Sequence, residues 1–176
     1  MLKNIDQRLC EELGKIRYAP MAVVGLVFSE KYFAKKPRGY GYLIPSLEKK
    51  EVLGVLFESD IFPGRCAPGQ VLLRVMIGGA RHPDIIRKSR EELVGLALDE
   101  IKPMMTEDAK TVEPQELFFV LWEQAIPQYN QSYCQLLPVI ERRLGRYPGL
   151  HLSANYLKGI SLNDCVENAY QAARMP

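Results

Sequence analysis

The chain has 176 residues, 47% of them hydrophobic and 25% charged, which is enough for a packed core and about one domain. Its 23 Lys and Arg residues nearly balance 21 Asp and Glu residues, and no dense basic block is present, so nucleic acid is not expected as a partner. The longest apolar run, residues 21–28, is far too short to span a bilayer.

The cysteines and histidines point away from disulfides and metal. Cys10, Cys66, Cys134 and Cys165 are far apart and form no C-x-x-C pair, which is typical of reduced thiols. The two histidines lie on separate expected elements without ligand spacing, so no metal site is predicted. With no signal-peptide pattern at the N-terminus, we expect a cytoplasmic protein, and peripheral contact with a membrane stays open.

The first half of the chain predicts one helix followed by consecutive strands. Apolar side chains recur at helical spacing over residues 2–16, and residues 21–28 are apolar on both faces, as in a central buried strand. Three strand candidates follow, at G-Y-G-Y-L-I-P, V-L-G-V-L-F and V-L-L-R-V-M-I. Because no helix separates them, they favour an antiparallel or mixed sheet.

The second half adds helices to this sheet. Ser89 and Glu92 have the spacing of a capping box in front of a helix. The run E-L-F-F-V-L-W predicts another strand, whose Trp122 we interpret as a packing anchor, and residues 133–144 predict a helix that Pro138 must kink or delay. The predicted fold is α+β: a mixed, mostly antiparallel sheet of four to five strands covered by helices, with a C-terminal strand–helix unit.

The C-terminal unit carries the clearest site signal. Residues 150–152 alternate like a short strand, and Gly159 leads into a helix that Ser161 and Asp164 begin with a capping box. This arrangement predicts the positive end of a helix dipole and free backbone N–H groups for an anionic or electron-rich ligand, at Ile160, Ser161 and Leu162. The alternative is an ordinary strand-to-helix connection without a ligand.

Two common signatures are missing. Gly39-x-Gly41 lacks the third glycine of a dinucleotide fingerprint and leads into a strand instead of a helix. No nucleophile stands beside a base at recognisable spacing, so no catalytic residue is assigned.

Five phrases in the same order and spacing resemble the C-terminal part of the protoporphyrinogen oxidase family, flavoenzymes with the flavin amine oxidase fold. They are G-Y-G-Y-L-I-P, L-G-V-L-F-E-S-D-I-F-P-G-R, V-L-L-R-V-M-I-G-G-A-R, W-E-Q-A-I-P-Q-Y and L-S-A-N-Y-L-K-G-I-S-L-N-D-C-V-E. The resemblance implies that the dinucleotide fingerprint lies in an N-terminal part that this chain lacks. Residues 1–145 then correspond to the C-terminal half of the substrate-binding domain, and residues 146–176 to the closing segment of the FAD-binding domain.

The resemblance also implies an activity: FAD-dependent oxidation of protoporphyrinogen IX to protoporphyrin IX in haem biosynthesis, with oxygen as acceptor, and a fragment that is inactive alone. The implied partners are the porphyrinogen and the missing N-terminal part, while a homodimer stays open. Carried over by position, the substrate contacts are Tyr40 facing the ring and Pro20 or Met21 as the opposing wall. The FAD contacts are Asn155, Ile160, Ser161 and Leu162.

Three alternatives remain at this point. The substrate could be coproporphyrinogen. The enzyme could be an amine oxidase or carotenoid desaturase of the same superfamily, although S-A-N-Y stands where amine oxidases carry A-G-E. In the third alternative the chain is a non-catalytic module that binds an apolar ligand or a partner, and Tyr40 and Met21 are core residues of adjacent strands.

Overall fold

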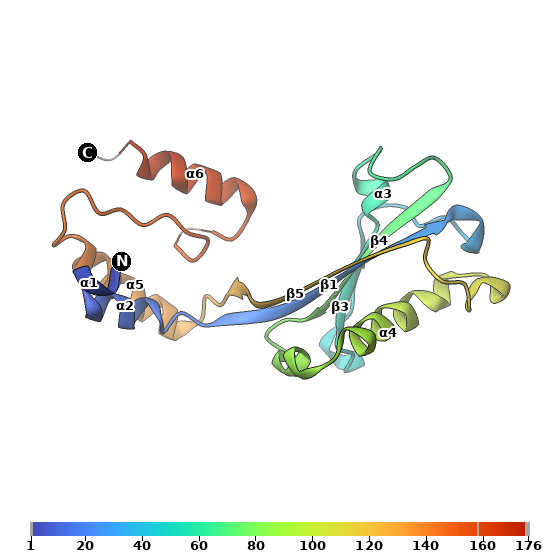
Figure 1. The fold of residues 1–176 in the computed structure, drawn as a ribbon, viewed down its shortest axis with the longest axis horizontal. Helices are drawn as coiled ribbons and strands as arrows, with labels where there is room; N and C mark the ends of the chain where they lie inside the picture. Colours follow the sequence, from blue (N-terminus) through green and yellow to red (C-terminus); the bar gives the residue numbers. More distant parts are fainter. Residues whose placement is uncertain (1, 158, 175–176) are drawn as a thin grey trace. The chain divides into compact units, whose positions relative to one another are not determined.

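The computed structural model describes residues 2–157 and 159–174, which divide into two compact units (Figure 1). Unit 1 comprises Met1–Ala19 and Gln124–Pro176, and unit 2 comprises Pro20–Glu123. The boundary predicted after residue 145 concerns the domains of a longer enzyme and stays a prediction. Within the described residues, no helix has the length and apolarity needed to cross a bilayer.

The sheet has five strands in the order β2-β3-β4-β1-β5. The pairs β2–β3, β3–β4 and β4–β1 are antiparallel, as the consecutive strand candidates predicted. β5 is an edge strand beside β1, and the Gln115 N–H donates to the Val27 carbonyl at 2.8 Å next to its start. The strands are β1 (Tyr18–Ser29), β2 (Gly41–Leu43), β3 (Val52–Leu56), β4 (Gln70–Gly78) and β5 (Glu116–Pro127).

One face of the sheet is buried under α4 (Arg90–Ile101), which runs alongside it in Figure 1. The predicted capping box is confirmed: the Glu92 N–H donates to Ser89 Oγ at 3.1 Å, and the Ser89 N–H donates to Glu92 Oε2 at 2.7 Å. Alternate side chains of β1 and β4 meet the helix, as the two-residue period of a strand requires. The fully buried residues of this core between the sheet and α4 include Ala22, Val24, Leu26, Phe28, Leu73, Val75, Ile77, Leu93, Ala97 and Ile101.

The opposite face of the sheet, which we call the open face, carries the side chains that alternate with this core. Arg74 is opposite Leu56 of β3 and Gly25 of β1, so these three residues form one row across the sheet. A Cβ atom at Gly25 would lie 3.3 Å from the Cβ of Phe118, which places β5 next in the row. The residues of β1, β4 and β5 on the open face include Met21, Val23, Gly25, Arg74, Met76, Phe118, Val120 and Trp122.

Trp122 is not the packing anchor that we expected. It is 56% exposed, and Phe118 and Val120, at alternate positions before it, are exposed to a similar extent. The side chains between them, Leu117, Phe119 and Leu121, pack against the core instead. Because β5 is an edge strand, its outward side chains have a neighbouring strand on one side only.

The helices of unit 1 are α1 (Leu2–Ile5), α2 (Gln7–Leu13), α5 (Gln131–Leu144) and α6 (Leu162–Ala172). The single N-terminal helix of the prediction is divided because Asp6 caps α2, accepting the Leu9 N–H at 2.9 Å. Pro138 lies inside α5, which begins seven residues earlier with Asn130 as its cap. A second core, separate from that of the sheet, contains Leu9, Ile16, Leu136 and Ile140.

The strand predicted for residues 150–152 does not form, and this part of the C-terminal prediction is wrong. Leu150 and Leu152 instead pack against the second core. A strand needs a partner for its backbone N–H and C=O groups, and none of the five strands in the described residues pairs with this segment. The helix predicted after it is present as α6.

Gly41 must be glycine for two reasons. Its φ is +124°, and an added Cβ atom would overlap the carbonyl oxygen of Val55. We expect Gly41→Ala to lower the free energy of unfolding by about 3 kcal/mol. The matched control is Gly39→Ala, where φ is also positive but a Cβ atom would meet nothing within 4 Å, and its loss should be about 1 kcal/mol. Equal losses in urea denaturation would contradict the steric explanation.

Asp6 predicts an acid-dependent loss of stability in unit 1. Its buried carboxylate accepts the Leu9 N–H, and it also accepts hydrogen bonds from Tyr147 at 3.2 Å and Arg143 at 2.9 Å. The Leu9 N–H above all lowers the pKa of Asp6 below 3.8, with Tyr147 and Arg143 adding to it against the effect of burial. A lowered pKa stabilises the fold fully above the unfolded value and loses this contribution as the pH falls through the folded value.

Asp6→Asn should therefore lower the melting temperature at pH 7, and the gap to the unmodified chain should narrow below pH 3.8. Circular dichroism melts over a pH series measure this gap. The control, Asp99→Asn, removes an exposed carboxylate that pairs with Lys102 and should change the melting temperature little. A gap that does not change with pH would show that the charge of Asp6 is not responsible.

Candidate functional site

The predicted cofactor residue Asn155 is held by two tyrosines at neighbouring strand ends. The Tyr129 hydroxyl donates to the Asn155 carbonyl at 2.5 Å, and the Tyr18 hydroxyl donates to Asn155 Oδ1 at 3.5 Å. Tyr18 begins β1, and Tyr129 follows the last residue of β5 by two positions. The segment in front of α6 is therefore fixed by the ends of two adjacent strands.

Tyr133 and Tyr156 complete what we call the tyrosine cluster, together with Tyr18 and Tyr129. The Tyr133 hydroxyl donates to the carbonyls of Tyr156 and Leu157, and its ring centre lies 4.8 Å from that of Tyr129. Burial raises the pKa of Tyr133 to about 12, and it also raises the pKa values of the other three tyrosines. All four hydroxyls therefore remain protonated near neutral pH.

Tyr129 also brings the start of α6 to Asn155. Burial above all raises the pKa of Tyr129, with the nearby Gly159 backbone acting against this effect and the Asp164 carboxylate adding to it. Sequence reasoning did not assign a role to any member of the tyrosine cluster. The available signal was Tyr129 itself, which ends the phrase W-E-Q-A-I-P-Q-Y.

The first turn of α6 is closed by its own side chains. The predicted capping box is confirmed: the Asp164 N–H donates to Ser161 Oγ at 3.0 Å, and the Ser161 N–H donates to Asp164 Oδ2 at 3.2 Å. Gly159 makes this possible, because its φ is +144° and any Cβ atom there would overlap the Asp164 carboxylate. The Ser161 amide, predicted to be free, is therefore already used.

The rest of this turn is available to a ligand. Ile160 and Leu162 are exposed, and the amides of Leu162 and Asn163 donate to no oxygen among the described residues. The Asp164 carboxylate already occupies the positive end of the helix dipole, so a second anion would meet repulsion. Of the anionic or electron-rich ligands that we expected, only a neutral hydrogen-bond acceptor suits this turn. The carbonyl groups of a flavin ring fit this requirement, whereas its pyrophosphate does not.

An apolar stripe runs along α6 from this turn. Leu162, Val166 and Tyr170 stand four residues apart and are 80%, 62% and 53% exposed, while Asn168 on another side of the helix is buried. Side chains at this spacing share one face of a helix. Exposed apolar side chains arranged in this way usually mark a surface that another polypeptide or ligand covers.

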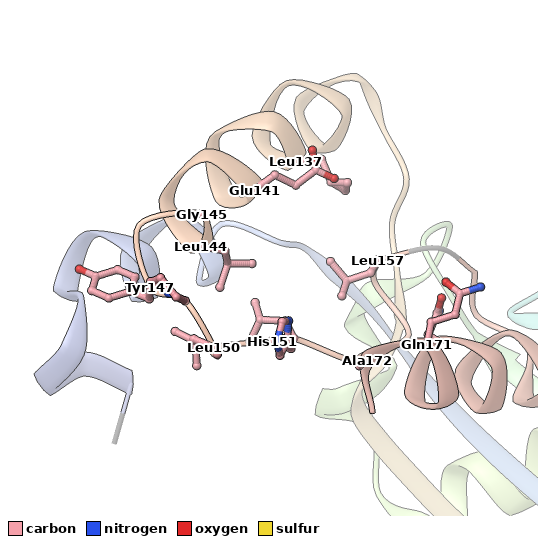
Figure 2. Close-up of a pocket in the computed structure, with 14 residues that line it drawn as sticks. Leu137, Glu141, Leu144, Gly145, Tyr147, Leu150, His151, Leu157, Gln171 and Ala172 are labelled. Atoms are coloured by element: carbon pink, nitrogen blue, oxygen red, sulfur yellow. The ribbon is translucent and has the colours of Figure 1, made fainter. Parts of the chain in front are cut away.

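Unit 1 also contains a cavity of about 620 Å³ between α5, residues 147–152 and α6 (Figure 2). Figure 2 shows Leu144 and Leu157 projecting into it, with Glu141 of α5 and Gln171 of α6 among the polar residues of its lining. None of the four predicted cofactor residues lines this cavity. It is therefore distinct from the start of α6.

The predicted substrate residues lie at different places in unit 2, and their contact with a substrate stays a prediction. Tyr40 is 80% exposed in the loop before β2, so it is not a core residue, and its carbonyl accepts the Phe57 N–H at 3.1 Å. Pro20 is buried, and Met21 lies opposite Gly78. According to the strand register, Met21 and Tyr40 are separated by five residues along the strands and by three strand spacings across the sheet. The distance between their backbones is therefore roughly 20 Å. Met21 belongs to the open face, together with Trp122.

Comparison with known proteins identifies the family. The family model for flavin containing amine oxidoreductase matches residues 3–175, so the chain belongs to this family. Protoporphyrinogen oxidase 1 of Arabidopsis thaliana is 32% identical over 98% of this chain and 34% of its own length. The corresponding enzyme of Spinacia oleracea is 33% identical over 98% of this chain and 32% of its own length. The chain thus spans about a third of these relatives.

A solved structure shows the same fold. The putative protoporphyrinogen oxidase from Exiguobacterium sp. 255-15 superimposes with a TM-score of 0.75 and 20% identity, covering 96% of this chain and 37% of that protein. The predicted α+β fold and the resemblance described above are confirmed by these findings. The individual cofactor and substrate contacts stay predictions.

The tyrosine cluster makes a testable contribution to the site. Tyr129→Phe removes the hydrogen bond to the Asn155 carbonyl and should lower the free energy of unfolding by about 1 kcal/mol. Amide hydrogen exchange over residues 155–157 and 159–161 should become faster. The control is Tyr156→Phe, because the Tyr156 hydroxyl has no acceptor among the described residues. Equal exchange rates in both variants would mean that Tyr129 does not hold this segment.

Proposed function

We propose that these 176 residues form the C-terminal part of an FAD-dependent protoporphyrinogen oxidase. The observation that carries the proposal is the match of 98% of the chain to one third of the A. thaliana relative. The likeness to the Exiguobacterium structure supports the fold of such a part. A cytoplasmic location belongs to the same proposal, and the free state of all four cysteines supports it.

Two features of unit 1 favour a larger protein. The apolar stripe of α6 is exposed, and residues 150–152 alternate like a strand but have no strand partner among the described residues. A sheet contributed by an N-terminal part would supply both a cover for the helix and a partner for the segment. The same features explain why this chain alone should bind FAD weakly or not at all.

The residues of this chain would hold the reactants and exclude water. When bound, FAD accepts the hydrogen removed from the porphyrinogen, and oxygen reoxidises it. The amides of Leu162 and Asn163 would donate to a neutral acceptor, and the exposed side chains of Ile160 and Leu162 would give that acceptor an apolar contact. The tyrosine cluster would keep Asn155 beside the same turn.

The open face is suited to the substrate. Phe118, Val120 and Trp122 offer an aromatic and apolar surface on which a flat tetrapyrrole can lie. The oxidation needs no nucleophile from the protein, which agrees with the lack of a nucleophile–base pair in the sequence. Binding and orientation are then the tasks that remain for these residues.

A fusion protein tests this proposal. The N-terminal two thirds of the A. thaliana relative, followed by these 176 residues, should purify with flavin absorbance and convert protoporphyrinogen to fluorescent porphyrin with oxygen uptake. Gly159→Ala in the fusion should weaken FAD binding by about tenfold, because the methyl group displaces Asp164 from the first turn of α6. Gly149→Ala is the matched control: φ is also positive there, but a Cβ atom meets nothing within 4 Å.

The alternatives give different results. A folded fusion that binds FAD but leaves protoporphyrinogen unchanged would contradict the proposed substrate, and parallel assays with coproporphyrinogen and with a primary amine would identify the alternative. A tight, stoichiometric FAD complex of the 176 residues alone would overturn the proposal that they are one part of a divided cofactor site.

A further inference from the structure

Arg74 is the basic side chain of the open face defined above. Its neighbours in sequence, Leu73 and Val75, are fully buried on the α4 side, so the strand period places Arg74 on the other side. It stands between Leu56 and Gly25 in the row that ends at Phe118. The side chain is 41% exposed, although its Nε atom is buried.

Glu58 holds this guanidinium in place. Its side chain, in α3 (Glu58–Ile61), is only 4% exposed, and Oε1 lies 2.5 Å from Arg74 Nη2. The second oxygen, Oε2, lies 3.1 Å from Arg65 Nη1. The Arg65 contact is a hydrogen bond, whereas Oε1 has no hydrogen-bond partner among the described residues, so Glu58 attracts Arg74 as a close ion pair. An ion pair with a buried carboxylate is screened less by solvent than an exposed pair, which favours a defined position for the guanidinium.

The charges of this cluster do not cancel. One carboxylate, Glu58, faces two arginines, Arg65 and Arg74, which leaves one positive charge. The other carboxylate of α3, Asp60, is paired with Arg38 at 3.1 Å and therefore does not supply the missing negative charge. The buried Nε atom of Arg74 has no acceptor among the described residues. A further carboxylate at the exposed side of Arg74 would balance the cluster.

The surface next to Arg74 is apolar. The ring of Phe118 lies beside Gly25 in the same row, and Val23 and Met76 form the next row. Farther along β5 are Val120 and Trp122. A fixed guanidinium at one end of an aromatic and aliphatic surface matches a flat apolar molecule that carries a carboxylate at its edge.

We propose that Arg74, oriented by Glu58, is a carboxylate-binding residue of the open face, where it takes one propionate arm of a porphyrin whose ring lies on the apolar surface. Arg74 contacts the ligand, and Glu58 is a positioning residue. The choice of porphyrin as the ligand class rests on the function proposed above. The carboxylate site itself rests on the geometry of the Arg65, Glu58 and Arg74 cluster.

The single tryptophan provides the measurement. Trp122 lies on the open face, so a porphyrin bound there should quench its fluorescence. The 176-residue chain is titrated with protoporphyrin IX and, in the same detergent, with its dimethyl ester, which lacks free carboxylates. Arg74→Gln should weaken binding of the free acid about fivefold to tenfold and change binding of the ester less than about twofold. Arg74→Lys should restore part of the affinity for the acid.

Two further variants separate binding from folding. Arg74→Gln leaves Glu58 with one partner, so the double variant Glu58→Gln with Arg74→Gln removes both charges and should show the same selective loss. Arg87→Gln is the matched control, since Arg87 is highly exposed and pairs with Asp84 on its own turn. Circular dichroism of each variant verifies that the fold is retained.

The outcomes are decisive for the carboxylate site. If Arg74→Gln weakens binding of the free acid but not of the ester, the carboxylate site is supported. Equal weakening for acid and ester, no effect of Arg74→Gln, or no quenching of Trp122 by either ligand would overturn it. None of these negative results decides the oxidase activity, which the fusion protein tests by flavin absorbance and turnover. Conversely, an inactive fusion combined with selective acid binding would leave the carboxylate site standing without a redox role.

Discussion

The register between β1 and β4 is the constraint on which unit 2 depends. It pairs Val24 with Val75 and Gly25 with Arg74, so the first pair meets α4 and the second lies on the open face. A shift by one residue would turn Arg74 into the core and expose the valines, because side chains alternate strictly along a strand. The buried face therefore fixes the register, and the register in turn decides which residues are available to a ligand.

The two candidate sites, the start of α6 and the open face, differ in the charge that they present to a ligand. At the start of α6, Asp164 satisfies the Ser161 amide and occupies the positive end of the dipole, so the remaining amides favour an uncharged acceptor. On the open face, two arginines share Glu58, so a positive charge remains. A ring with neutral carbonyl groups suits the first site, and a carboxylate suits the second. The two sites thus differ in the chemistry of the ligand that each one selects.

The sequence predicted features that depend on near neighbours in the chain. The capping boxes at Ser89 and Ser161 are confirmed because all their atoms lie within four residues, and the strands follow from apolar runs of sufficient length. Several features that depend on distant partners were wrong or missed. The strand at residues 150–152 lacks a partner, Trp122 lies on an edge strand, and the tyrosine cluster joins residues far apart in sequence. Local patterns contain no information about such partners.

The exposed apolar surfaces weigh against a non-catalytic interaction module. Such a module needs one docking surface, whereas the described residues carry at least two of different form. One is the helical stripe at Leu162, Val166 and Tyr170, and the other is the flat row at Phe118, Val120 and Trp122. A helical stripe of this kind packs well on a sheet, and a flat aromatic surface accepts a planar ring. The longer flavoenzyme proposed above would account for both surfaces, because its remaining flavin domain would cover the helix and its substrate would cover the sheet. In that protein only the second surface, which carries Arg74, would have to remain accessible after folding.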